Sequence, residues 1–170
     1  MKGFEGRSEE LKSKAISYGL CDKYVNEWSD GLNSDELLKR YKDGIHFCIR
    51  NDYPTLDYMR THFTKEETEK HHVYIDGEAA LANADDVVVL NGKSKVKYVA
   101  SGNSITHIYV RHDSVLHLGT GDFAMVVVHL HDRGEVIAAQ MGRSKVTILK
   151  YSDESKVKNV GNIRIISKEF

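Results

Sequence analysis

Aromatic, imidazole and guanidinium side chains recur at spacings of two and twenty residues in the second half of this chain. Tyr109 and Arg111 are followed twenty residues later by His129 and His131, and Tyr151 extends the series by a further twenty. Residues two apart on a β-strand face the same side, so these groups would share one surface. Such a surface can stack on a ring and donate hydrogen bonds to an anion, a sugar or an acidic protein. We take these five residues as the candidate binding residues; the alternative is a row of solvated side chains without a ligand.

The same residues do not predict a metal site or a catalytic centre. His129 and His131 offer two imidazoles, but a third ligand is missing and Arg111 would repel a cation. The chain has no G-x-S-x-G, no Walker A and no G-x-G-x-x-G motif. Asp113 and Asp132 could meet as paired acids at a bend, although the neighbouring Arg and His residues favour a salt network. No catalytic residue, metal or cofactor is therefore predicted.

A repeat places the candidate residues. Small residues return every ten positions, at Ala84, Ser94, Ser104, Ser114, Ala124, Gly134 and Ser144, with Ser155 one residue late. Segments twenty residues apart match better than segments ten apart, so residues 84–163 can be written as four coils of two strands each. Coils would stack about 4.8 Å apart, with Val88, Ile108, Val128 and Ile148 in one internal column and Leu90, Val110 and Leu130 in another. The competing interpretation is an antiparallel β-sandwich, which Asn91-Gly92 supports as a hairpin signal.

The pattern of a small residue, then an apolar residue two and four places later, runs from Ala84 to Val157. It resembles the short-coil parallel β-solenoid (β-helix) proteins. It is unlike the hexapeptide acyltransferases, whose period is six, and unlike the five-residue rhythm of pentapeptide-repeat proteins. The resemblance covers roughly half the chain and implies an architecture, with no active-site residue attached to it.

The composition changes near residue 70, which predicts an α+β chain with a helical domain at residues 1–72 and a β-solenoid at residues 73–170. Ser8, Ser34 and Thr55 are candidate N-caps for short helices. Because a solenoid exposes its interior at each end, we expect the helical domain to cap the first coil. The last coil would then be open to a partner or to self-association.

Charge and cysteine content limit the possible functions. The chain has 24 Lys plus Arg against 25 Asp plus Glu, so no global attraction to nucleic acid is expected. A local cluster at Lys39, Arg40, Lys42 and Arg50 leaves nucleic-acid binding open, although acidic residues are interspersed. Cys21 and Cys48 share no C-x-x-C motif, and reduced thiols are favoured over a disulfide. No apolar run is long enough to span a membrane, and a cytoplasmic location is expected.

These observations favour a non-enzymatic interaction or scaffold protein that presents a solenoid face to a protein or glycan. One alternative is a nucleic-acid-binding regulator that uses the N-terminal helices. Another is a solenoid carbohydrate-active enzyme.

Overall fold

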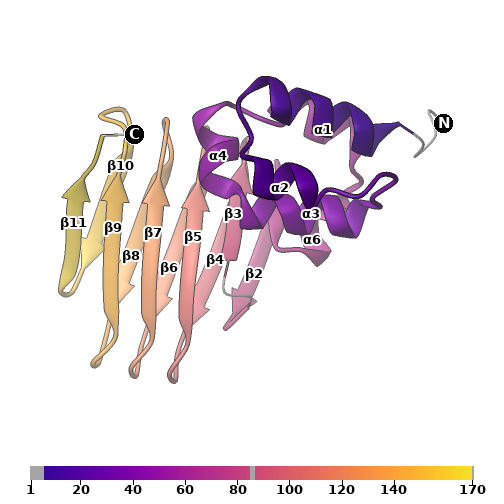
Figure 1. The fold of residues 1–170 in the computed structure, drawn as a ribbon. Helices are drawn as coiled ribbons and strands as arrows, with labels where there is room; N and C mark the ends of the chain where they lie inside the picture. Colours follow the sequence, from indigo (N-terminus) through magenta and orange to yellow (C-terminus); the bar gives the residue numbers. More distant parts are fainter. Residues whose placement is uncertain (1–5, 85–86, 170) are drawn as a thin grey trace. The chain divides into compact units, whose positions relative to one another are not determined.

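The computed structural model describes residues 6–84 and 87–169. They form an α+β chain of two compact units, Met1–Glu67 and Thr68–Phe170 (Figure 1). The first unit is helical, and the second is built from parallel strands. The predicted fold class is confirmed.

The helical part contains short helices that wrap an apolar core. Their bounds are α1 Arg7–Ser17, α2 Asp22–Asn26, α3 Ser34–Asp43, α4 Ile45–Arg50, α5 Leu56–His62 and α6 Lys65–Lys70, which crosses the boundary between the units. Thr55 caps α5 as predicted, since its hydroxyl accepts from the Tyr58 amide at 3.2 Å. The other two cap predictions are wrong. Asn33 rather than Ser34 caps α3, in a reciprocal capping box with Glu36, and the buried Ser8 hydroxyl accepts from the Trp28 indole at 3.0 Å instead.

The second unit is a parallel β-solenoid. Its strands are β1 Val73–Ile75, β2 Glu78–Ala82, β3 Val87–Asn91, β4 Lys95–Ala100, β5 Ile105–Val110, β6 Val115–Thr120, β7 Met125–Leu130, β8 Glu135–Gln140, β9 Lys145–Lys150, β10 Lys156–Val160 and β11 Ile163–Ser167. Odd-numbered strands form sheet A and even-numbered strands form sheet B. Every recorded strand pair is parallel. The antiparallel alternative is therefore wrong.

The register follows the period of twenty. Ile108 pairs with Val88 below it and with Val128 above it, and Val128 pairs with Ile148. All four side chains are fully buried, as are Leu90, Val110 and Leu130, so the two predicted internal columns are confirmed. The strands make about five turns rather than four. The extra turn comes from β1 and β2, whose offsets from the next coil are sixteen and seventeen residues and therefore break the period.

The small residues of the repeat close the bends. The hydroxyls of Ser94, Ser104 and Ser144 each donate to the carbonyl three residues earlier, at 2.7 to 2.9 Å. Gly134 has no room for a side chain, because a Cβ atom there would lie 2.9 Å from Leu130 Cδ1. Thr106, an exception to the apolar pattern, is buried and its hydroxyl lies 3.1 Å from the Tyr98 hydroxyl. The exception thus preserves the core by pairing two polar groups.

Candidate functional site

The structure brings four of the five predicted residues into one aromatic stack in the solenoid unit. Tyr109 on β5 and His129 on β7 are in register, and their rings stack at 4.2 Å between centroids with 9° between planes. His131 and Tyr151 stack at 4.4 Å and 1°. His129 and Tyr151 lie 6.2 Å apart at 7° and join the two pairs. Stacking of residues twenty apart is a direct consequence of parallel coils in register.

Polar contacts extend the stack at both sides. His107 Nδ1 lies 3.1 Å from His129 Nε2, so one imidazole donates to the other and at least one of the two rings is neutral. Arg111, the fifth predicted residue, donates to the Asn91 side chain at 3.4 Å. Burial raises the pKa of Tyr109 to about 12, with a further contribution from Tyr151. The Tyr109 phenol is therefore neutral at physiological pH.

These side chains have little access to solvent. Tyr109, His129, His131 and Arg111 are each only 4–5% exposed. They point away from the interior of the coil, yet they are packed rather than solvated. Tyr151 keeps partial exposure.

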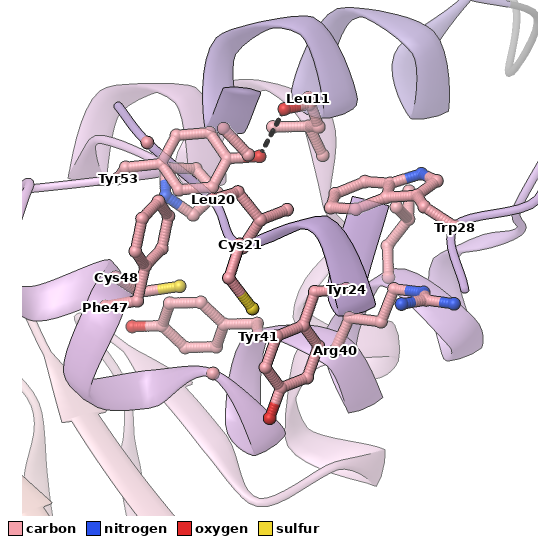
Figure 2. Close-up of a pocket in the computed structure, with 15 residues that line it drawn as sticks. Leu11, Leu20, Cys21, Tyr24, Trp28, Arg40, Tyr41, Phe47, Cys48 and Tyr53 are labelled. Carbon is pink, nitrogen blue, oxygen red and sulfur yellow. Dashed lines mark hydrogen bonds between the residues drawn. The ribbon is translucent and has the colours of Figure 1, made fainter. Parts of the chain in front are cut away.

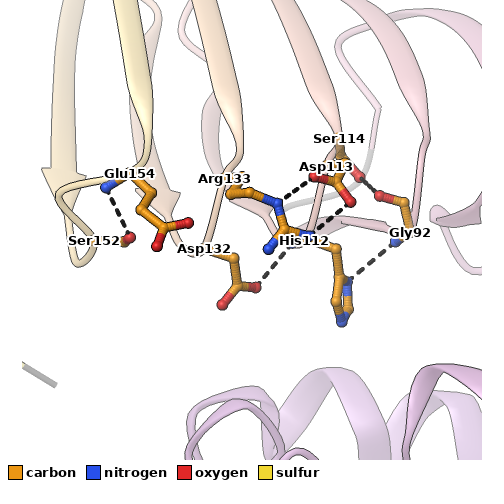
Figure 3. Close-up of polar contacts among 8 residues, drawn as sticks. All are labelled: Gly92, His112, Asp113, Ser114, Asp132, Arg133, Ser152 and Glu154. Atoms are coloured by element: carbon orange, nitrogen blue, oxygen red, sulfur yellow. Dashed lines mark hydrogen bonds and ion pairs between the residues drawn. The ribbon is translucent and has the colours of Figure 1, made fainter.

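The two acids considered as a pair are both engaged in the bends after β5 and β7 (Figure 3). Arg133 donates two hydrogen bonds to the Asp113 carboxylate, at 2.6 and 2.9 Å. Asp132 Oδ2 accepts from the His112 amide at 2.9 Å, and His112 Nδ1 accepts from the Gly92 amide of the coil below at 3.1 Å. His112 and Asp132 both have positive φ, 56° and 53°. The side chains of His112 and Asp132 each form a hydrogen bond between one bend and the neighbouring coil, and their role is therefore structural.

Comparison with protein-family models, with curated proteins and with solved structures finds no match to this chain. Among the described residues, no group of three or more His, Cys, Asp or Glu side chains could hold a metal ion. In the same part of the chain, no helix has the length and apolar character needed to cross a membrane.

The structure reveals an exposed apolar surface that the sequence analysis missed. Seven large hydrophobic side chains in the described part of the solenoid are exposed, and six of them lie at one end of the strands: Val99, Ile105, Phe123, Met125, Met141 and Val160, at 44–74% exposure. The bends that carry Phe123 and Met141 lead from sheet B into β7 and β9 and lie side by side, at the tails of these strands (Figure 1). The signal in the sequence was the presence of apolar residues at outward or bend positions, where the repeat does not need them.

The outer face of sheet B continues this surface. Val99, Gly119, Ala139 and Val160 pair successively across β4, β6, β8 and β10, and we call this row the small-residue column. The outward neighbours in the adjacent column are Lys97, His117, Ile137 and Lys158. Small apolar side chains in register leave the backbone accessible to a close approach.

The charge on the outer face of sheet B is predominantly positive. Its outward residues include four lysines, Lys95, Lys97, Lys156 and Lys158, against two glutamates, Glu78 and Glu135. Lys158 Nζ lies 2.9 Å from Glu135, whose pKa is lowered mainly by this hydrogen bond, and Lys95 Nζ lies 3.9 Å from Glu78. Both glutamates are thus paired with lysines of the same face, and the face keeps a net positive charge.

Proposed function

We propose that the protein is a non-enzymatic interaction module, and that the outer face of sheet B binds an acidic, partly apolar segment of another protein. The observation that carries this proposal is the small-residue column, which is apolar and has lysines beside it. Large exposed apolar patches rimmed by polar residues mark interaction sites on soluble proteins.

The charges favour an acidic partner over a second copy of this chain. Two copies joined through this face would place two predominantly positive surfaces against each other, and like charges at an interface are unfavourable. An acidic segment would meet these lysines with opposite charge, while its apolar side chains cover Val99, Ala139 and Val160. Electrostatic attraction of this kind speeds association and sets specificity.

The apolar centre favours a protein over a nucleic acid or a glycan. Nucleic-acid sites depend on dense phosphate contacts, whereas the centre of this face carries Gly119 and Ala139. Glycan recognition would need exposed aromatic rings for stacking. The outward residues of β4, β6, β8 and β10 include no Phe, Tyr or Trp, and Tyr109 and His129 are buried. Protein segments supply acidic and apolar groups together.

Binding to synthetic polypeptides tests this proposal without knowledge of the natural partner. The chain would be titrated with a random copolymer of glutamate and tyrosine, with polyglutamate, with a random copolymer of lysine and tyrosine, and with duplex DNA. We expect the glutamate–tyrosine copolymer to bind about tenfold more tightly than polyglutamate, because only the copolymer covers the apolar column. Equal affinity for the two acidic polymers, tighter binding to DNA or to the lysine copolymer, or no binding would overturn the proposal.

A further inference from the structure

A cavity of about 300 Å³ lies within the helical unit, between α1, α2, α3, α4 and the segment that follows α4 (Figure 2). All of its lining residues belong to the helical unit, and nothing in the proposed function uses it. Its wall includes Leu11 and Ala15 from α1, Trp28 after α2, Tyr41 from α3 and Phe47 from α4. Tyr24 and Cys21 are exposed, so the cavity reaches the surface beside them.

The aromatic part of the wall is held in place by hydrogen bonds. The Trp28 indole donates to Ser8 at 3.0 Å, and the Tyr53 hydroxyl donates to the Leu11 carbonyl at 2.5 Å. Burial raises the pKa of Tyr53 far above its ordinary value, so the phenol stays neutral. A rigid wall of this kind loses little conformational freedom when a ligand binds.

Charge distinguishes this cavity from a simple packing void. Arg40 is the one charged side chain among the described residues that line it, and the lining includes no acid. The Arg40 guanidinium lies 5.3 Å from the Trp28 ring centre and donates to the Glu27 carbonyl. Because a guanidinium carries five N–H groups, this single bond leaves others for an anion. The cavity therefore combines apolar walls with one fixed positive charge.

The volume sets the size of the occupant. An apolar cavity of about 150 Å³ accommodates benzene, which has six heavy atoms. A volume of about 300 Å³ is therefore suited to roughly ten to twelve heavy atoms. This is the size of a medium-chain fatty acid or of a small aromatic acid, and within the usual lower range of ligand pockets.

From these observations we propose that the helical unit binds a small amphiphilic carboxylate, with its apolar body among Trp28, Tyr41 and Phe47 and its carboxylate on Arg40. The apolar walls supply the driving force through burial of the hydrocarbon part. A carboxylate held by a guanidinium forms charge-assisted hydrogen bonds, which are stronger than neutral ones. The charge should therefore discriminate the acid from the alcohol of equal length.

Trp28 provides the measurement, because it is the only tryptophan in the chain. The full chain would be titrated with octanoate and with 1-octanol, and Trp28 fluorescence would be followed, with calorimetry as a second readout. We expect a saturable change with octanoate, and an affinity about tenfold higher than for octanol. No saturable change with octanoate, or equal affinity for the two probes, would overturn the proposal.

Substitutions in and near the cavity test where the two probes bind. Arg40→Met keeps the apolar stem and removes the charge, so octanoate should lose its advantage over octanol. Lys39→Met is the matched control on the same helix: Lys39 is exposed and is not part of the cavity wall, and its loss should leave the octanoate affinity unchanged. Ala15→Leu fills part of the cavity and should lower the affinity for both octanoate and octanol. If Arg40→Met retains the preference for octanoate, or if Lys39→Met abolishes it, the proposal fails.

Discussion

Asp113 and Arg133 lie twenty residues apart in the sequence and in neighbouring coils of the structure, joined by two hydrogen bonds of 2.6 and 2.9 Å (Figure 3). The pair illustrates how residues one period apart in the sequence come into contact in the solenoid. Because the coils are in register, a charge at one position of the bend meets the residue one coil further along. Both side chains are substantially exposed, so the pair contributes modestly to stability.

This pair should give the protein a measurable response to acid. Hydrogen bonding from Arg133 lowers the pKa of Asp113. A carboxylate with a lowered pKa in the folded state contributes stability above its unfolded pKa of about 4, and this contribution is lost as the pH falls through the folded value. We predict that Asp113→Asn is less stable than the native chain at pH 7 and that the difference shrinks below about pH 4. Thermal melting between pH 7 and pH 2 measures it; a difference that does not change with pH would contradict the assignment.

The internal columns are tested by a buried charge. Val128→Asp places a carboxylate in the fully buried column between Ile108 and Ile148. We expect a loss of about 3–5 kcal/mol in the free energy of unfolding, as for an uncompensated buried charge. Val99→Asp is the matched control, because Val99 points outward and is 53% exposed. Urea unfolding followed by circular dichroism compares the two, and similar midpoints would show that Val128 is not inside.

The tight bend at Gly134 gives a third test. A Cβ atom at Gly134 would lie 2.9 Å from Leu130 Cδ1 and 3.0 Å from Val110 Cγ1. Gly134→Ala should therefore cost about 1–3 kcal/mol through overpacking. Gly121, in the bend after β6, has open space at the same atom, so Gly121→Ala should be nearly neutral. Chemical unfolding of both variants measures the difference, and equal stabilities would contradict the described packing.

How much could be predicted from the sequence depends on which property is considered. The twenty-residue period predicted that Tyr109 and His129 are neighbours, because parallel coils fix that relation. It missed the first coil, since β1 and β2 are offset from the next coil by sixteen and seventeen residues. Ser155 follows the ten-residue repeat one position late in the sequence. The structure explains this shift, because Lys156 pairs with Glu135 at an offset of twenty-one residues.

The period of the sequence did not predict how exposed each outward side chain is. Alternation assigns a side chain to the outside of a coil, but it does not say how open that outside is. Tyr109 and Val99 are both outward residues, yet Tyr109 is 4% exposed and Val99 is 53% exposed. The candidate binding residues were selected from the sequence for the chemistry of their side chains, and their exposure to solvent was not predicted. The exposed apolar residues of sheet B and its bends were recognisable only once the packing was known.

The buried phenol of the stack predicts a response to alkali. The pKa of Tyr109 is raised to about 12, chiefly by burial. A group whose folded pKa is raised contributes stability below its unfolded value of about 10, and this stability is lost as the pH rises toward 12. Burial raises the pKa of Tyr58 to about 12 as well. Ultraviolet titration of the phenolates should therefore show two tyrosines that ionise near pH 12 in the native chain and one in Tyr109→Phe. Titration curves that coincide would contradict the packing of this ring.

The most direct test of the proposed interaction face is a single charge placed at its centre. Ala139→Glu puts an acid in the small-residue column, where it would repel an acidic partner and interrupt the apolar surface. Ile165→Glu is the matched control, since Ile165 is 45% exposed and lies on sheet A. In titrations with the glutamate–tyrosine copolymer, we predict that Ala139→Glu weakens binding at least tenfold while Ile165→Glu leaves the dissociation constant within about twofold of the native value. Unchanged binding by Ala139→Glu, with both variants folded by circular dichroism, would contradict the account.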